Sequence, residues 1–225
     1  MLTVSQPSIE HLEDEIVRRI EMLANPDTQS LRGIRREFSK KLAGYPPQFV
    51  ISLALKLIRS GSVPRFLAYE LVQNNAAAIK NLNARSLQEL GEGIASWGAV
   101  DCFACYVSGL AWREGSVSDV VLVRWAKLPD RWWRRAALVS TVPLNSRAQG
   151  GRGDTYKTLK ICSMLVDDRD DMVVKALSWA LRELSKRDPK AVRTFLAENR
   201  SRLAPRVLRE VNNKLQTGLK NPRRI

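Results

Sequence analysis

The sequence predicts an all-α protein, and two observations support that class. Apolar residues recur at three- and four-residue spacing over 9–23, 31–42, 48–60 and 64–75, which is the period of one helix face. Proline and glycine end these stretches at short intervals, and no alternating run with hairpin signals stands out. The hydrophobic content of 44% is sufficient for a buried core.

Two of the predicted helices repeat one another in sequence. When Asp130 is aligned with Asp170, the basic Arg135 falls on Lys175, and an alanine follows each of the two basic residues. An aspartate at the start of a helix suits the positive end of the helix dipole, and a small alanine lets neighbouring helices approach closely. This pattern is typical of the second helix of a HEAT-like pair.

The length of the chain then predicts its organisation. We expect an α-solenoid superhelix of about six HEAT-like helical pairs, because stacked repeats of this kind bury a continuous core. The expected boundaries are a single repeat domain over 1–225 with a basic C-terminal flank over about 200–225. Ligands of such solenoids usually lie on the concave face.

Positive charge dominates the composition. The chain has 37 Lys and Arg against 23 Asp and Glu, a net charge of +14. From residue 179 to the end there are 13 Lys and Arg against 4 Asp and Glu, a surplus of nine. A field of this sign concentrates polyanions, so nucleic acid is the expected partner and an anionic membrane surface comes second.

The three cysteines and the single histidine do not form a metal-ligand pattern. Cys102 and Cys105 are a lone C-x-x-C, and no second pair or nearby histidine accompanies them. We expect both to pack as small apolar residues, with no metal and no cofactor. The N-terminus lacks the pattern of a signal peptide, and no run approaches the ~18 apolar residues that span a bilayer. The expectation is a monomeric, cytoplasmic protein, nucleoid-associated in a prokaryote, without a membrane.

The segment 145–156, Asn-Ser-Arg-Ala-Gln-Gly-Gly-Arg-Gly-Asp-Thr-Tyr, interrupts the helical pattern. Its glycines and polar residues predict a flexible loop between repeats. Such a loop is either a tolerated surface insertion or lies near a phosphate backbone. The segment lacks the Lys-Ser/Thr of a nucleotide-binding loop, so no such role is assigned.

Aromatic and charged residues share helix faces in two places. Trp97 and Asp101 are four residues apart, one helical turn from each other. A second face combines one tryptophan with three cations at steps of four, three and four, at Lys175, Trp179, Arg182 and Lys186. Burying three cations without partners is prohibitive, so this stripe is expected to face solvent or a polyanion. Trp112 and Trp125 lack such a setting, and Trp133 falls on the apolar position of the repeat, so we expect core positions for all three.

The order of three motifs resembles a known family. The chain shows W-x-x-x-D at 97–101, W-x-R-R-x-A at 132–137 and K-A-x-x-W-x-L-R-E at 175–183. This pattern resembles the AlkD-type DNA alkylation repair enzymes, the HEAT-like repeat alkylpurine DNA glycosylases. The resemblance covers most of the chain, since 30–42 and 65–72 also look like N-terminal repeats of that family.

The resemblance implies a superhelix wrapped on double-stranded DNA, and excision of positively charged N3- and N7-alkylated purines without a metal or cofactor. By position, Trp97 and Trp179 resemble the aromatic pair that holds the deoxyribose of the lesion, and Asp101 resembles the catalytic carboxylate. Arg135, of the pair Arg134-Arg135, resembles the phosphate-binding arginine. The expected DNA-binding set is Arg134, Arg135, Lys175, Arg182 and Lys186. One departure stands out: members often show W-D-x-x-D, whereas Gly98 replaces the first acid here.

The residues themselves allow more than one function. An alkylated purine cation is already a good leaving group, so a carboxylate between two tryptophans is a sufficient minimal site for its hydrolysis. The main alternative is a non-catalytic HEAT-repeat protein that binds distorted or branched DNA, and a protein-binding scaffold is a third hypothesis. A Schiff-base lyase is disfavoured because no lysine lies in an apolar setting that would lower its pKa.

Overall fold

The computed structural model describes residues 7–222, and every regular element in that range is helical. The all-α class is therefore confirmed. The chain forms two compact units that divide between Glu92 and Gly93. The single domain over 1–225 stays a prediction, and the end of the predicted basic flank, 223–225, lies outside the described residues.

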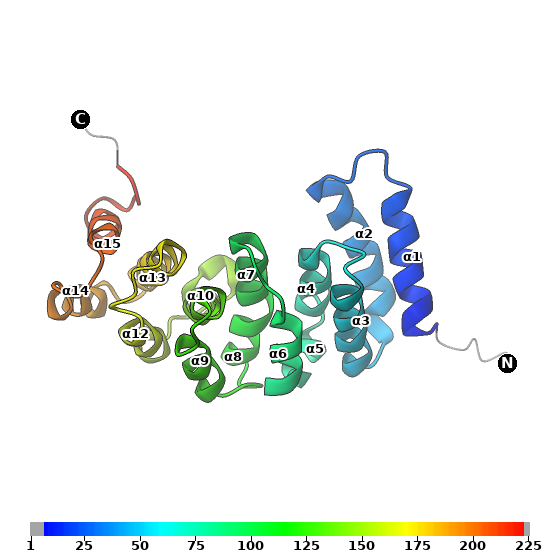
Figure 1. Cartoon of the computed structure of the whole chain (residues 1–225), viewed down its shortest axis with the longest axis horizontal. Helices are drawn as coiled ribbons and strands as arrows, with labels where there is room; N and C mark the ends of the chain where they lie inside the picture. The colour runs from blue at the N-terminus through cyan, green and yellow to red at the C-terminus, as the bar shows by residue number, and fades with distance from the viewer. Residues whose placement is uncertain (1–6, 223–225) are drawn as a thin grey trace. The chain divides into compact units, whose positions relative to one another are not determined.

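The first unit contains the four helices expected from apolar spacing and two short ones (Figure 1). These are α1 (Ile9–Glu21), α2 (Thr28–Lys41), α3 (Pro47–Ser60), α4 (Arg65–Gln73), α5 (Ala76–Asn81) and α6 (Ala84–Gly91). Gly61 ends α3 in the left-handed region at a φ of 65°, which glycine adopts without strain. Glu70 of α4 is buried and binds Arg32 and Arg35 of α2 at 2.8 and 3.0 Å, so an ion-pair network joins these helices.

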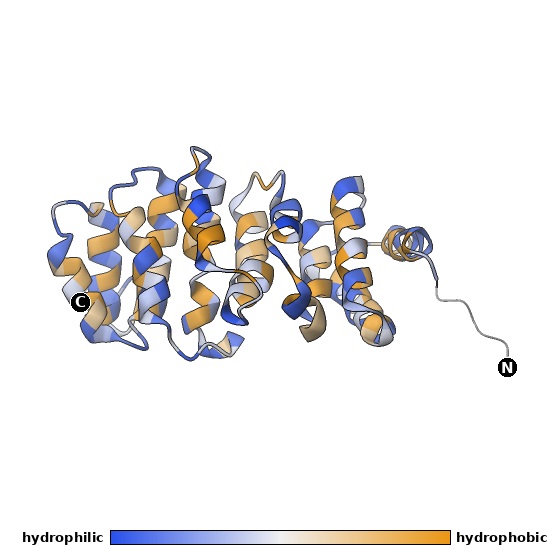
Figure 2. Ribbon diagram, turned by 90° about the horizontal axis from the view of Figure 1, so that it is seen from below, coloured by the Kyte–Doolittle hydropathy of each residue, from blue (hydrophilic) through white to orange (hydrophobic). Residues whose placement is uncertain are grey.

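The second unit stacks its longer helices in two rows (Figure 1). One row contains α7, α10, α13 and α15, and α9, α12 and α14 follow along its other side. Each of these helices has both hydrophobic and hydrophilic residues, as expected for a helix that buries one face and exposes the other (Figure 2). The bounds are α7 (Trp97–Phe103), α8 (Gly109–Arg113), α9 (Asp119–Ala126), α10 (Arg131–Val139), α11 (Val142–Asn145), α12 (Thr155–Met164), α13 (Asp171–Leu184), α14 (Pro189–Glu198) and α15 (Pro205–Thr217).

The predicted repeat in this unit is confirmed by its caps. Asp130 is the N-cap of α10, where its side chain accepts a hydrogen bond from the Trp132 amide. Asp170 is the N-cap of α13 and accepts one from the Met172 amide. The equivalent helices α10 and α13 pack directly against each other. Each pairs with the helix before it, α9 or α12, as HEAT-like pairs do.

The tryptophans assigned to packing are buried, as predicted. Trp112 and Trp125 are 1% and 0% exposed, and Trp133 is 9% exposed. Trp133 lies 4.7 Å from Trp125 and meets Phe103 of α7 edge-on at 6.1 Å between ring centroids. This aromatic cluster fixes α10 against α7 and α9, and so sets where the polar side of α10 lies.

The segment 145–156 differs from the predicted flexible loop. Asn145 is buried, accepts a hydrogen bond from the Asp154 amide at 3.1 Å and donates one to Thr158 at 2.9 Å. The Arg187 guanidinium donates to the carbonyls of Asn145 and Gly151 from the far end of α13. The segment is an anchored connection between α11 and α12, because its backbone carbonyls and amides find partners in the fold.

Candidate active site

The helix that carries Asp101 is positioned by a cap and a close crossing. Ser96 caps α7, so Trp97 begins the helix and Asp101 lies one turn later on the same face, as its spacing predicted. After α7 the chain makes a π-helical turn over Ala104–Ser108. A Cβ on Gly109 would lie 2.6 Å from the Ser140 carbonyl oxygen, so only glycine allows α8 to approach the end of α10 this closely. The Ser108 and Ser140 hydroxyls join the two helices at 2.6 Å.

Asp101 forms a two-pronged ion pair with Arg135 of α10. The Arg135 Nε donates to Oδ1 at 2.9 Å and Nη2 donates to Oδ2 at 2.8 Å. The remaining guanidinium nitrogen, Nη1, donates to the Met172 carbonyl oxygen in the first turn of α13 at 2.6 Å. Arg135 therefore ties α7, α10 and α13 together through one planar fork, the geometry in which arginine binds carboxylates best.

The pair is largely removed from water. The side chains of Arg135 and Asp101 are 7% and 18% exposed. Burial raises the pKa of Asp101 above the ordinary aspartate value, and the hydrogen bonds and charge of Arg135 partly offset that rise. The carboxylate is thus held in a dry environment and keeps one lone pair on each oxygen beyond those that Arg135 uses.

Asp101 and Trp179 line the same cavity, which has a volume of about 330 Å³. Trp179 reaches it from α13 and is half-buried. The other lining residues come from α7, the π-helical turn, the 142–149 segment and α13: Cys102, Cys105, Tyr106, Val142, Ser146, Ala148, Gln149 and Glu183. The structure thus brings together the acid and one of the two tryptophans that the sequence singled out.

Two residues in the wall of this cavity have unsatisfied acceptor atoms. The Oε1 atom of Gln149 and the Oε2 atom of Glu183 are buried and accept no hydrogen bond from the described part of the chain. The other carboxylate oxygen of Glu183 binds Lys186 at 2.6 Å. Buried unpaired oxygens are rare in folded proteins, so this wall favours a ligand that is cationic or rich in N–H and O–H donors.

Trp97 occupies a different environment from Trp179. Its side chain is 62% exposed at the first residue of α7, and it is not among the residues that line the cavity. The two tryptophans therefore lie on the helices at either side of α10, one exposed and one half-buried.

Comparison with known proteins gives one match. A search of curated proteins finds no significant relative. The sequence model of the family described as "DNA alkylation repair enzyme" matches residues 25–215, most of the chain. The protein belongs to the DNA alkylation repair enzyme family. This membership indicates a role in alkylation repair with DNA as the partner, and it agrees with the resemblance found in the sequence.

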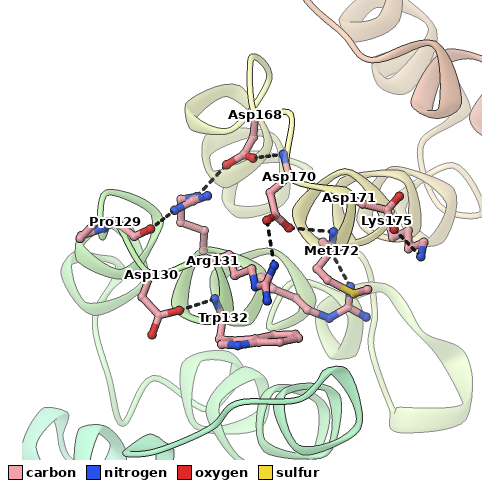
Figure 3. A network of polar contacts seen from close by, with 11 residues as sticks. Pro129, Asp130, Arg131, Trp132, Asp168, Asp170, Asp171, Met172 and Lys175 are labelled. Carbon is pink, nitrogen blue, oxygen red and sulfur yellow. Dashed lines mark hydrogen bonds and ion pairs between the residues drawn. The ribbon is translucent and has the colours of Figure 1, made fainter.

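The arginine pair of α10, expected to face a DNA backbone, is bound by acids of the protein itself. Besides the Arg135 contacts above, Arg134 is 19% exposed, and its Nε donates to Asp168 at 2.7 Å. It also binds the carbonyl oxygens of Leu128 and Pro129, so it fastens the turn before α10 to the turn before α13. Figure 3 shows Pro129 and Asp168 of these two turns. Acids of two neighbouring repeats, Asp168 and Asp101, neutralise these cations, and sequence spacing does not reveal such partners. That Arg134 and Arg135 bind DNA stays a prediction.

The predicted basic stripe on α13 is also only partly solvent-facing. Arg182 is 16% exposed and points at Glu210 of α15, with 4.0 Å between Nε and the carboxylate. Lys175 and Lys186 are 41% and 47% exposed, and they pair with two acids of α13, Asp171 and Glu183. Lys186 lies in the turn after α13, which ends at Leu184. Two of the three predicted cations thus remain accessible, and α15 covers the third.

Several residues of the site were missed by the sequence analysis. Glu183 follows Trp179 by four residues, so helical spacing alone already places it beside the ring. Gln149 had no such signal, because it reaches the cavity from an irregular segment. Cys102 and Cys105 were assigned to packing; both line the cavity, and burial raises the pKa of the Cys105 thiol, which therefore stays protonated.

No cluster of ligands for a metal ion is found among residues 7–222 of this DNA alkylation repair enzyme. The acids beside the cavity, Asp101 and Glu183, are engaged by Arg135 and Lys186. Between residues 7 and 222 no helix combines the length and apolar character needed to cross a membrane.

Proposed function

We propose that the protein is a monofunctional DNA glycosylase of base excision repair. It hydrolyses the N-glycosidic bond of positively charged N3- and N7-alkylated purines in duplex DNA, without a metal or cofactor. The observation that carries the proposal is the buried Asp101–Arg135 pair beside the cavity that Trp179 lines. Family membership supports the partner and the pathway.

The chemistry needs little from the protein at the leaving base. The base is cationic, so it departs with the electron pair of the C1′–N bond as a neutral purine. Positive charge then develops on the deoxyribose. The oxygen of a water molecule forms a bond to C1′, and the water gives up a proton to a general base of the protein. Asp101 is the acid placed to oppose that charge and to accept that proton, through the lone pairs that Arg135 leaves unused.

The expected rate gains favour the role of Asp101 as the acceptor of the water proton over its role in opposing the charge on the sugar. A carboxylate ~4 Å from the developing charge stabilises it by ~4 kcal/mol at an effective dielectric of ~20. The Arg135 charge, a few ångströms farther away, takes back about 2–3 kcal/mol of that. The remaining ~1–2 kcal/mol corresponds to about tenfold in rate, whereas a positioned general base contributes typically about 10²–10⁴. Asp101 therefore acts mainly on the attacking water.

The tryptophans contribute by excluding water and by facing a cation. An indole face over a positive charge contributes about 0.5–2 kcal/mol. Trp179 stands beside Asp101 in the cavity wall, and the exposed Trp97 is available to the bound DNA. Arg134, Arg135, Arg182, Lys175 and Lys186 stay the proposed DNA-binding set, and the two lysines are the most exposed of them.

A direct assay tests the function. The protein is incubated with duplex DNA that carries 7-methylguanine or 3-methyladenine, and heat or alkali then reveals abasic sites. Excision by the wild type supports the proposal. The alternative is a non-catalytic binder of distorted or branched DNA, and the observation that favours it is the ion pair in which Arg135 binds both carboxylate oxygens of Asp101. Salt-sensitive DNA binding without excision would select that alternative.

A further inference from the structure

A second cavity, here named the Arg152 pocket, lies beside the anchored 145–156 segment. Its volume is about 380 Å³, and it is distinct from the Asp101 cavity. Three of its lining residues are cations, and the glycine-rich stretch provides part of its wall. The lining consists of Arg113, Glu114, Leu144, Gly150, Arg152, Gly153, Asp154 and Lys157.

The glycine-rich wall has one defined backbone conformation. Gly150 and Gly153 have φ values of 76° and 100°, in the left-handed region that residues with a side chain rarely adopt. A Cβ on Gly151 would lie 2.4 Å from the Pro143 carbonyl oxygen, so this residue packs directly on the backbone of α11. The amides of Gly151 and Gly153 donate to the carbonyls of Ser146 and Leu144 at 2.8 and 2.9 Å. The wall is thus a fixed platform.

The pocket has more cationic donors than acceptors. Arg152 is exposed and forms no hydrogen bond or ion pair with the described part of the chain. Arg113 uses Nε for Glu114 and Nη1 for the Gln149 and Pro143 carbonyls, which leaves the Nη2 donors unused. The Nζ atom of Lys157 lies 5.3 Å from the centroid of the Trp112 ring and 3.8 Å from Oδ2 of Asp154.

The two acids of the pocket are already engaged. Glu114 accepts from Arg113 at 3.2 Å, and Asp154 caps α12 by accepting from the Lys157 amide at 2.9 Å. Their charges leave a surplus of one positive charge, carried by Arg152, which has no ion-pair partner among residues 7–222. A guanidinium fork with free donors suits a phosphate group, whose oxygens accept several hydrogen bonds at once.

We propose that the Arg152 pocket binds a phosphate of the DNA backbone. One segment connects the two cavities, since Ser146, Ala148 and Gln149 line the Asp101 cavity and Gly150 begins the wall of the Arg152 pocket. DNA that presents a nucleotide to Asp101 therefore passes close to Arg152. The inference rests on DNA being the partner, and it does not require that the protein excise bases.

The test measures how salt weakens binding to unmodified duplex DNA in the wild type, Arg152→Gln and Arg193→Gln. Loss of one phosphate contact lowers the slope of log K against log salt by about 0.9, equivalent to about eightfold in affinity at 0.1 M salt. Arg193, exposed on α14, is the matched control because its removal takes the same charge from outside the pocket. Arg152→Gln is expected to show that loss and Arg193→Gln a clearly smaller one.

Equal slopes for the two variants would overturn the proposal. A titration with inorganic phosphate alone, monitored by the amide chemical shifts of residues 150–154, distinguishes a free phosphate ion from a phosphate of the DNA backbone. In one outcome, phosphate no longer changes the amide shifts in Arg152→Gln, but the salt dependence of its DNA binding matches the wild type. The pocket then binds a free anion, and the proposed contact with DNA is wrong. Because Arg152 forms no hydrogen bond or ion pair with a described residue, its loss is not expected to alter the melting temperature. The excision assay is run separately, so failure of catalysis leaves this binding result interpretable.

Discussion

Arg135 and Asp101, 34 residues apart in sequence, share two hydrogen bonds of 2.9 and 2.8 Å across the packed helices α10 and α7. The pair places the proposed catalytic carboxylate in one orientation, because a planar fork binds a carboxylate in a single plane. It also joins the repeat that carries Trp97 to the one that carries Trp179.

Asp101→Asn is expected to reduce excision at least roughly 10²-fold. The amide keeps the size of the side chain but accepts no proton from water, and the loss of a general base costs typically about 10²–10⁴ in rate. Single-turnover excision of 7-methylguanine measures the effect, and binding to unmodified duplex DNA serves as the control. Wild-type excision by this variant would refute the role given to Asp101.

Arg135→Lys is expected to move the acid limb of the pH–rate profile to higher pH. Excision needs ionised Asp101, so activity falls as pH drops through its pKa, which burial raises above the ordinary value of about 4. Arg135 opposes that rise, and lysine lacks its two-pronged fork, so the pKa of Asp101 increases further in the variant. The profile of kcat/KM between pH 4 and 8 measures the shift.

The control for this experiment is Arg131→Lys, an exposed arginine on the same helix. Its acid limb is expected to match that of the wild type. Melting temperatures identify any general loss of folding, since breaking a buried pair destabilises by about 3–5 kcal/mol. An unmoved limb in folded Arg135→Lys would mean that Asp101 does not control the rate.

Two glycine substitutions are expected to have opposite effects on stability. A Cβ on Gly98 meets no atom within 4 Å, so Gly98→Ala in the first turn of α7 is expected to stabilise by about 0.5–1 kcal/mol. A Cβ on Gly151 would lie 2.4 Å from the Pro143 carbonyl, and Gly151→Ala is expected to destabilise by about 1–3 kcal/mol. Denaturant unfolding measures both, and the same sign for both would contradict the structure.

Asp119→Ala is expected to destabilise the second unit by about 1–3 kcal/mol, because it leaves the buried Trp112 indole N–H without its acceptor. Asp119 also binds Lys160 at 2.9 Å, and these two hydrogen bonds lower the pKa of Asp119. A lowered carboxylate pKa stabilises the fold above the unfolded-state pKa, and that contribution is lost as pH falls through the folded-state value. The difference in melting temperature between wild type and variant should therefore shrink in acid.

Asp167→Ala is the matched comparison for Asp119→Ala. Asp167 pairs with Arg202 but is 59% exposed, so its removal is expected to change the melting temperature far less. If the two variants melted alike, the Trp112 hydrogen bond would not contribute to stability.

Much of the fold followed from local pattern. The apolar spacing placed α1–α4, the repeated aspartates placed the caps of α10 and α13, and the four-residue step placed Trp97 and Asp101 on one face. These features depend on residues three to five positions apart, which a helix brings together regardless of the rest of the chain.

The partners of the charged residues did not follow from the sequence. Asp168 and Glu210 lie 34 and 28 residues from Arg134 and Arg182, the arginines they engage. The anchoring of 145–156 depends in the same way on Arg113 at the end of α8 and on Arg187 in the turn after α13.

The sequence by itself determined the helical class, the repeat in the second unit, the family and the identity of the proposed acid. Only the tertiary structure decided that Arg134 and Arg135 bind carboxylates of the protein and that Glu183 and Gln149 line the cavity with Asp101. It also decided that Arg152 finds no ion-pair partner in the described part of the chain. The physical reason is that helix periodicity acts over one or two turns, whereas the neutralisation of a charge depends on which helices pack together.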